Sequence, residues 1–309
     1  MKPIRLDPDD KQLQQTALGL LAAGDWGGLT ALARALPPQS AYAMLQLLAE
    51  AAPLTADVSH LIASKDAMDL TVAGALLHGR AVRHRGVGMA EDVTEDQWEL
   101  YIPTLAHAQE LLAEANRRAP ELGLAAAWRV SAFIDATEEQ KDEAEIALRR
   151  ATGIPVSGLS RLITMRSEKW GGSHDEMWRV VADYAEAALP GSLALIAKAH
   201  FEQWLWYSAF DEGPDAAATA EAYLHRKDVR EDLIEASKRV LAAREPSDPR
   251  AILLADNAFA ATFWTSESAK DARPHLQRMG RNIDRTVWLF ENPRLALNVA
   301  RARAWLLPV

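Results

Sequence analysis

The most regular feature of the chain is the spacing of its apolar residues, which recur every three to four positions over most of its length. In one such stretch Leu70, Ala73, Leu77 and Ala81 would lie on one face of a helix. Alanine-rich stretches of this kind, roughly 12–20 residues long, alternate with short breaks that carry Pro, Gly, Asp or Ser. No stretch keeps the strict apolar–polar alternation of a β-strand over a useful length. The pattern therefore predicts an all-α fold.

The breaks divide the chain into predicted helices of unequal length. They are expected over residues 9–23, 26–36, from 40, 55–64, 66–85, 95–118, from 120 past 134, 138–150, up to 165, 173–189, 193–210, from 215, 228–244, 250–264, 266–280, 283–290 and 293–307. Thr94 and Gln97 predict a capping box, and Pro103 predicts a kink or a separate first turn. About sixteen or seventeen helices make about eight antiparallel pairs. We expect one helical-repeat domain over residues 1–309, in which residues 1–64 and 66–309 could form sub-units.

Several segments resemble known helical repeats. The start of one predicted helix, Trp26-x-x-Leu29, resembles the opening of a tetratricopeptide repeat. Two joins between helices resemble the junctions of such repeats, and they run Ala236…Ala243…Pro246-Ser247-Asp248-Pro249-Arg250-Ala251 and, more loosely, Ala115…Ala119-Pro120-Glu121-Leu122. The resemblance implies an irregular tetratricopeptide-like superhelix of stacked antiparallel helix pairs, because the regular repeat spacing is poorly kept.

The middle of the chain, about residues 66–265, also resembles an uncharacterised bacterial domain of unknown function. Members of that family carry an Arg-Gly-x-Gly segment and a Lys-Trp-Gly-Gly-Ser segment. Both occur here, as Arg85-Gly86-Val87-Gly88 and Lys169-Trp170-Gly171-Gly172-Ser173. The resemblance implies a helical fold and carries no chemistry with it.

Composition and charge exclude several classes of function. The formal net charge of −9 argues against a general nucleic-acid binder, which needs an excess of Lys and Arg on one face. The absence of cysteine excludes disulfides, thiolate metal sites and cysteine nucleophiles. No segment reads as a signal peptide or as a membrane span, so we expect a cytoplasmic protein that binds no membrane. No metal site and no cofactor are expected, since the usual catalytic and nucleotide-binding motifs are missing.

The helix predicted from residue 193 carries the main candidate site. At 100° per residue, six of its side chains share one face: Ile196, His200, Gln203, Trp204, Tyr207 and Asp211. Aromatic walls with a few polar groups are typical of ligand sites, although a hydrogen-bonded groove between helices would use the same residues. His200 and Glu202 cannot share a metal ion, because two residues on a helix diverge by about 200°.

Two further segments are candidate ligand sites. Trp170 and His174 flank a Gly-Gly-Ser turn whose backbone N–H groups could cradle an anion, although the same sequence is common turn chemistry. Arg80 and His84 lie one turn apart in a basic cluster that could bind an acidic ligand. The cluster could also be there simply because the helix dipole stabilises positive side chains at the C-terminal end of a helix.

Two functions remain open from the sequence. The first is a helical-repeat protein whose concave groove binds a peptide or protein partner. The second is an enzyme or small-molecule binder with a His- and aromatic-lined pocket inside the superhelix. An open groove lined by Lys, Arg and Asn would favour the first, and a deep aromatic cavity with a titratable His would favour the second. The ligand, the partner and the oligomeric state do not follow from the sequence.

Overall fold

The computed structural model describes residues 10–86, 90–187, 189, 191–242, 248–280, 282–284, 287–288 and 293–306. These residues are mainly helical, which confirms the all-α prediction, and they contain no strand. One isolated parallel bridge pairs Leu122 with Thr152. Of the segments that carry the resemblances, residues 87–88, 243 and 246–247 lie outside the described residues.

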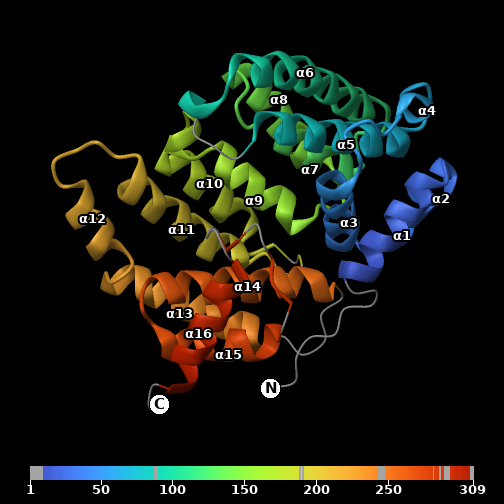
Figure 1. The fold of residues 1–309 in the computed structure, drawn as a ribbon. Coiled ribbons are helices and arrows are strands. Elements are labelled where there is room, and N and C mark those ends of the chain that lie inside the picture. The colour runs from blue at the N-terminus through green and yellow to red at the C-terminus, as the bar shows by residue number, and fades with distance from the viewer. Residues whose placement is uncertain are drawn as a thin grey trace. The chain divides into compact units, whose positions relative to one another are not determined.

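The helices follow one another through short connections (Figure 1). They are α1 (Asp10–Ala22), α2 (Trp26–Ala35), α3 (Pro38–Ala51), α4 (Ser59–Ile62), α5 (Ala67–Arg85), η1 (Ala90–Asp92), α6 (Glu95–Arg118), α7 (Gly123–Ala132), α8 (Glu138–Arg150), α9 (Val156–Met165), η2 (Glu168–Trp170), α10 (His174–Tyr184), α11 (Ala194–Ala209), α12 (Ala216–Tyr223), α13 (Lys227–Ala242), α14 (Pro249–Thr265), α15 (Ala269–Met279) and α16 (Pro293–Leu306).

Most predicted helices are present, and local capping explains several of their ends. The predicted capping box is confirmed: the Thr94 side chain accepts from the Gln97 backbone, and the Gln97 side chain accepts from the Thr94 backbone. Pro103 lies inside α6, which continues through it as one α-helix. The prediction of a separate first turn there is therefore wrong.

Three other predictions of helix position are wrong, and a hydrogen bond from outside the helix accounts for each. Pro120 does not open a helix, because Thr152 binds the Glu121 carbonyl and α7 begins only at residue 123. The helix predicted to reach residue 189 ends at Tyr184, where the Ser192 hydroxyl donates to the carbonyls of residues 185 and 187.

The third wrong boundary concerns residues 283–290. The described residues 282–284 and 287–288 are not helical. The buried Asn257 binds the Asn282 carbonyl, the Asp284 backbone N–H and the Trp288 indole N–H instead. Within the described residues of this segment, the backbone N–H groups of Val287 and Trp288 donate to the Asp284 carbonyl, so only one turn is formed there.

The chain divides into two compact units, residues 7–161 and the part from residue 162 onward. We call them the N-terminal unit and the C-terminal unit. The division expected near residue 65 falls inside the N-terminal unit, where α3 packs against α5.

In the N-terminal unit, α5 and α6 lie side by side, α3 and α7 both pack on α5, and α7 packs on α8. Two of these helix contacts are close because a glycine of α5 lies at each of them. A Cβ on Gly74 would lie 2.6 Å from Leu112 Cγ, and one on Gly79 would lie 2.5 Å from the Ala49 Cβ. Neither position leaves room for a side chain, so glycine sets the spacing of these helices.

In the C-terminal unit, α14 packs against α11, α13 and α15, and α16 packs on α15. Helix α14 is buried on nearly all sides, from Arg250 to Phe263. It forms the centre of this unit, so polar residues on α14 must find their partners inside the protein.

Candidate functional site

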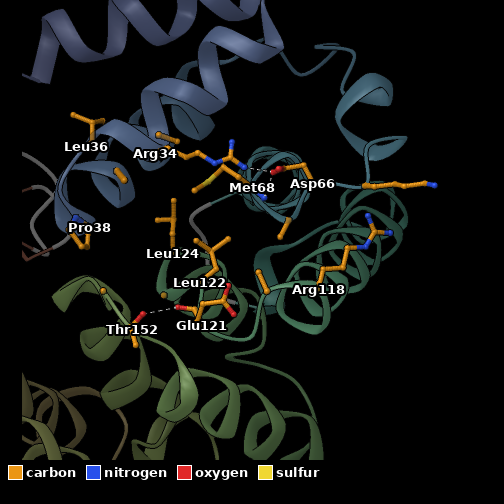
Figure 2. Close-up of a pocket in the computed structure, with 17 residues that line it drawn as sticks. Arg34, Leu36, Pro38, Asp66, Met68, Arg118, Glu121, Leu122, Leu124 and Thr152 are labelled. Atoms are coloured by element: carbon orange, nitrogen blue, oxygen red, sulfur yellow. Dashed lines mark hydrogen bonds and ion pairs between the residues drawn. The ribbon is translucent and has the colours of Figure 1, made fainter.

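A pocket of about 620 Å³ lies in the N-terminal unit, at the edge where several helices begin or end. The C-terminal ends of α2 and α6, the N-terminal ends of α3, α5 and α7 and the connection between α8 and α9 contribute to its wall. Its apolar surface is formed by nine side chains: Ala33, Leu36, Pro38, Ala41, Ala67, Met68, Ala119, Leu122 and Leu124. In Figure 2, Leu36 and Pro38 lie at the left of the pocket, and Leu122 and Leu124 lie close together near its centre.

Charged side chains line the rim of this pocket. Arg34 and Asp66 form an exposed ion pair at 2.5 Å, and the Asp66 carboxylate also caps α5. Arg118 donates to the Ser64 carbonyl at 3.0 Å and pairs with Glu114. Burial acts against ionisation of Asp66, but the hydrogen bond from Arg34 and those from the α5 backbone hold its pKa below the usual value. Asp66 is therefore ionised throughout the physiological pH range.

Lys65 and Glu121 complete the rim. Both side chains are exposed, and neither has an ion pair among the described residues. With Arg34, Arg118 and Asp66 they give the pocket three positive and two negative side chains. The lining contains no aromatic ring and no histidine. This is an apolar floor with a polar, mildly basic border.

Backbone contacts hold one wall of the pocket in place. Thr152 donates its backbone N–H and its hydroxyl to the Glu121 carbonyl, at 3.0 and 3.2 Å (Figure 2). A Cβ on Gly123 would lie 2.3 Å from the Thr152 carbonyl oxygen. The α8–α9 connection therefore presses against the start of α7. Sequence reasoning missed this pocket, because its residues come from connections far apart in the chain and match no motif.

The structure places the predicted Arg80 and His84 in the N-terminal unit, on α5. Arg80 donates to the Ala56 carbonyl at 2.5 Å, and Arg83 donates to the Ala52 carbonyl at 2.6 Å. Both arginines thus satisfy backbone carbonyls at and after the end of α3. Burial lowers the pKa of Arg80. His84 is half-buried, and its role as a ligand residue stays a prediction.

His78 also lies on α5, two residues before Arg80, against the edge of the Trp128 ring, with 5.7 Å between ring centroids. Trp128 stacks on Tyr42, whose hydroxyl bonds the Ser131 hydroxyl at 2.8 Å. Burial, together with nearby Arg161, lowers the pKa of His78 to about 4. His78 is therefore neutral at physiological pH, and its half-buried ring packs on Trp128.

In the C-terminal unit, the structure brings together four of the predicted site residues: His174, His200, Gln203 and Tyr207. Trp178 is a pure donor, so its 2.9 Å hydrogen bond fixes the Gln203 amide with Oε1 toward the indole. The same oxygen accepts from the Tyr223 hydroxyl at 2.7 Å, and Gln203 Nε2 donates to the Tyr207 hydroxyl at 3.1 Å. His200 is 5% exposed.

His200 bonds with both of its ring nitrogens. Nδ1 lies 2.9 Å from the Tyr223 hydroxyl and Nε2 lies 3.0 Å from Asp232 Oδ2. Tyr223 already uses its proton toward Gln203, so its oxygen must accept from Nδ1. The Trp178 ring packs edge-on against the imidazole at 4.7 Å. The partners of this cluster come from α10, α12 and α13, and it joins them to α11.

Three predicted members, Trp204, Trp170 and His174, lie outside this hydrogen-bonded cluster. Trp204 is half-buried and packs on Phe201 at 5.3 Å, and Trp170 is 36% exposed at the end of η2. His174 contacts the edge of Tyr207 at 5.5 Å, and its buried Nδ1 is 3.8 Å from Glu168 without a hydrogen bond. The binding role of this face stays a prediction.

The Gly-Gly-Ser turn uses its backbone N–H groups internally. Gly171 donates to Glu168, Gly172 to Ser167, and Ser173 to Arg166. A Cβ on Gly172 would lie 2.3 Å from the Arg166 carbonyl oxygen, which explains the glycine. The Ser173 hydroxyl then caps α10 by accepting from the Glu176 N–H at 3.1 Å. This geometry favours the turn over the anion cradle.

Glu202, on the opposite side of α11, is 3% exposed. Its Oε1 accepts from Lys198 at 2.5 Å and from Thr164 at 3.0 Å, and Lys169 lies 3.5 Å from Oε2. Burial would raise the pKa of Glu202, but the two lysines and these hydrogen bonds lower it to about 2. Glu202 is a buried carboxylate that holds η2 to α11.

A buried Ser–His–Asp chain in the C-terminal unit was missed by sequence reasoning. Ser237 Oγ lies 2.7 Å from His275 Nε2, and His275 Nδ1 lies 2.8 Å from Asp256 Oδ1. Arg278 donates to both Asp256 carboxylate oxygens at 2.7 Å and to the Val240 carbonyl at 2.8 Å. We call these four side chains the Asp256 cluster. Its residues come from α13, α14 and α15 without a recognisable spacing.

The connectivity of the Asp256 cluster is that of a hydrolase triad, but its setting is different. His275 and Asp256 are 0% exposed, and Ser237 lies mid-helix in α13 at 5% exposure. A substrate carbonyl would need access to Ser237 and nearby free N–H donors, and a mid-helix N–H is already bonded. The burial of His275 lowers its pKa despite the adjacent Asp256. We interpret the cluster as a structural link between three helices.

Among the described residues, no group of three or more His, Cys, Asp or Glu side chains could hold a metal ion. None of the helices in the described part of the chain is long and apolar enough to cross a membrane. Comparisons of the chain with protein-family models, with curated proteins and with solved structures found no match.

Proposed function

We propose that this protein is an irregular, tetratricopeptide-like helical-repeat protein that binds a peptide segment of a partner protein. The pocket of the N-terminal unit is the proposed site. The single observation that carries the proposal is its lining, an apolar floor bordered by Arg34, Lys65 and Arg118. An extended peptide needs apolar room for one or two side chains and polar groups at the edge for its flanks.

The charges at the rim indicate which peptides fit. Asp66 already pairs with Arg34, and Glu114 already pairs with Arg118. Lys65 and Glu121 are both left without an ion pair among the described residues, so the peptide side chain nearest Lys65 should be acidic and the one nearest Glu121 should not. We therefore expect a peptide with one or two aliphatic residues next to Asp or Glu.

The lining also separates the two functions that the sequence left open. An enclosed aromatic cavity with a titratable histidine would support an enzyme or a small-molecule binder. The pocket is lined by neither an aromatic ring nor a histidine. The polar atoms of His200, Gln203 and Tyr223 are hydrogen-bonded to one another. Peptide or protein binding is the better supported of the two.

Selection of a displayed random peptide library against the full chain tests this proposal. We expect enriched peptides to share an aliphatic residue beside an acidic one, and Lys65→Glu to weaken their binding about 10-fold, because it replaces an attraction with a repulsion. Lys238→Glu is the matched control, because Lys238 is an exposed lysine of the C-terminal unit. Failure to enrich any common pattern, or equal loss in both variants, would contradict the proposal.

A further inference from the structure

A second, smaller pocket lies in the N-terminal unit, beside the turn between α6 and α7. Its volume is about 270 Å³, and the residues that matter here are Asn116, Pro120, Arg129, Glu143, Ile146 and Arg150. They come from the last turns of α6, from α7 and from α8. Lys65 and the other rim residues of the larger pocket do not line it.

Asn116 is the unusual member of this pocket. Its side chain is 5% exposed, yet neither Nδ2 nor Oδ1 has a hydrogen-bond partner among the residues that the structure describes. Buried amides are almost always bonded, because leaving both groups unpaired forfeits the hydrogen bonds that water would have made. An amide that lines a pocket and lacks partners therefore points to something that binds there.

Arg129 has a second unpaired donor at the same place. Its guanidinium lies over the Phe133 ring at 5.4 Å, and Nη2 donates to Glu143 Oε2 at 2.9 Å. Its Nε is buried without a partner in the described part of the chain. A bound molecule that satisfied these atoms would offer two acceptors, for Asn116 Nδ2 and Arg129 Nε, and one donor, for Asn116 Oδ1.

The charges of the lining limit the charge of that molecule. Arg129 is paired with Glu143, and Arg117 shares Glu114 with Arg118. Arg150 is left with no ion pair among the described residues, so the lining carries an excess of positive charge. This excess favours an anion, and the two donors Asn116 Nδ2 and Arg129 Nε match the two oxygens of a carboxylate.

We propose that this pocket binds a carboxylate that has an amide N–H next to it. In this arrangement the carboxylate oxygens accept from Asn116 Nδ2 and Arg129 Nε near Arg150, and the N–H donates to Asn116 Oδ1. Pro120 and Ile146 cover one small side chain. Both an N-acylated amino acid and the C-terminus of a peptide carry this chemistry, and the pocket has room for about one residue. This site is independent of the peptide site proposed above.

Calorimetric titration of the full chain with N-acetylalanine tests the proposal. Propionate lacks the N–H donor, and N-acetylalaninamide lacks the carboxylate. We expect each to bind at least 10-fold more weakly than N-acetylalanine. A tetrapeptide that ends in alanine distinguishes the two sources, because tighter binding than N-acetylalanine assigns the site to peptide C-termini and weaker binding assigns it to a free acid. Equal binding of all three small probes, tighter binding of inorganic phosphate, or no binding at all overturns the proposal.

Two variants and a control locate the site. Asn116→Leu keeps the number and branching of the side-chain heavy atoms and removes the amide, and Arg150→Gln removes the uncompensated charge on the surface. Each should weaken N-acetylalanine at least 10-fold, whereas Lys65→Gln should leave its affinity unchanged. Arg150 is exposed, so Arg150→Gln keeps the test valid even if Asn116→Leu fails to fold. Unchanged affinity in Arg150→Gln and in a folded Asn116→Leu would place the binding elsewhere and overturn the assignment.

Discussion

The Asp256 cluster and the smaller pocket around Asn116 are both buried polar sites, but they satisfy their hydrogen bonds differently. In the Asp256 cluster, Ser237, His275 and Arg278 all bond within the protein. Around Asn116, three buried side-chain atoms have no partner among the described residues. A network whose polar atoms are all hydrogen-bonded within the protein joins helices. A network with unbonded polar atoms can form hydrogen bonds with an added molecule. The two sites contain similar polar groups and differ in whether those groups are hydrogen-bonded within the protein.

Removing the acid at the centre of the closed network should have the largest effect. Asp256→Ala leaves Arg278 and His275 buried without their partner, and we expect it to lower the free energy of unfolding by about 3–5 kcal/mol. Urea denaturation at neutral pH measures the loss. Ser237→Ala removes only one neutral hydrogen bond and should cost about 1 kcal/mol. Equal losses in the two variants would show that the cluster does not depend on the ion pair.

Replacing the Gln203 amide should cause the second largest loss of unfolding free energy. Gln203→Leu leaves the Trp178 indole N–H and the Tyr223 hydroxyl unpaired, and we expect a loss of about 2–3 kcal/mol. Gln46→Leu is the matched control, because Gln46 makes only one long bond at the surface. A loss below about 1 kcal/mol would indicate that water reaches the cluster and replaces the amide. Such a result would support the predicted ligand role of the His200 face.

Acid should weaken both units through their buried histidines. The pKa of His78 is lowered to about 4 and that of His275 is also lowered, so the unfolded chain binds these protons first as the pH falls. Their stabilising contribution is complete above about pH 6.5 and is lost between that value and the folded-state pKa. For His78 we expect a loss of roughly 1–3 kcal/mol by pH 4.

Denaturation curves measured from pH 7 to pH 4 test this expectation. His78→Gln should flatten the dependence, because glutamine does not titrate. Glu202 acts at lower pH: its pKa of about 2 lies below the ordinary value of 4.5, so its contribution is lost only as the pH falls below about 4.5. An unfolding free energy that stays constant between pH 7 and pH 5 in the unmodified chain would contradict the assignment of neutral buried histidines.

The smallest change in the free energy of unfolding is expected for Asn116→Leu, and the sign of this change tests the comparison. Asn116→Leu replaces an unpaired amide with an apolar side chain that has the same number and branching of heavy atoms, so the free energy of unfolding should stay constant or rise by about 1 kcal/mol. Thermal melts of the ligand-free chain measure it. A loss of 2 kcal/mol or more would show that Asn116 is satisfied in solution, and the contrast with the Asp256 cluster would disappear.

The sequence by itself determined the helical class and most helix starts, because these depend on local chemistry. Apolar spacing predicted the helices, and Thr94 with Gln97 predicted a capping box that the structure contains. Local signals were misleading where a distant side chain supplied the hydrogen bonds. Asn257 holds residues 282–284 and Trp288 in a non-helical segment, and Thr152 holds Glu121 ahead of α7.

Only the tertiary structure decided which polar residues meet. Helical spacing placed His200, Gln203 and Tyr207 on one face, but their partners Tyr223 and Asp232 come from α12 and α13. The larger pocket, the Asn116 pocket and the Asp256 cluster all combine residues from several helices. Periodicity along one helix shows which residues share a face, but it does not show what the neighbouring helix presents to that face.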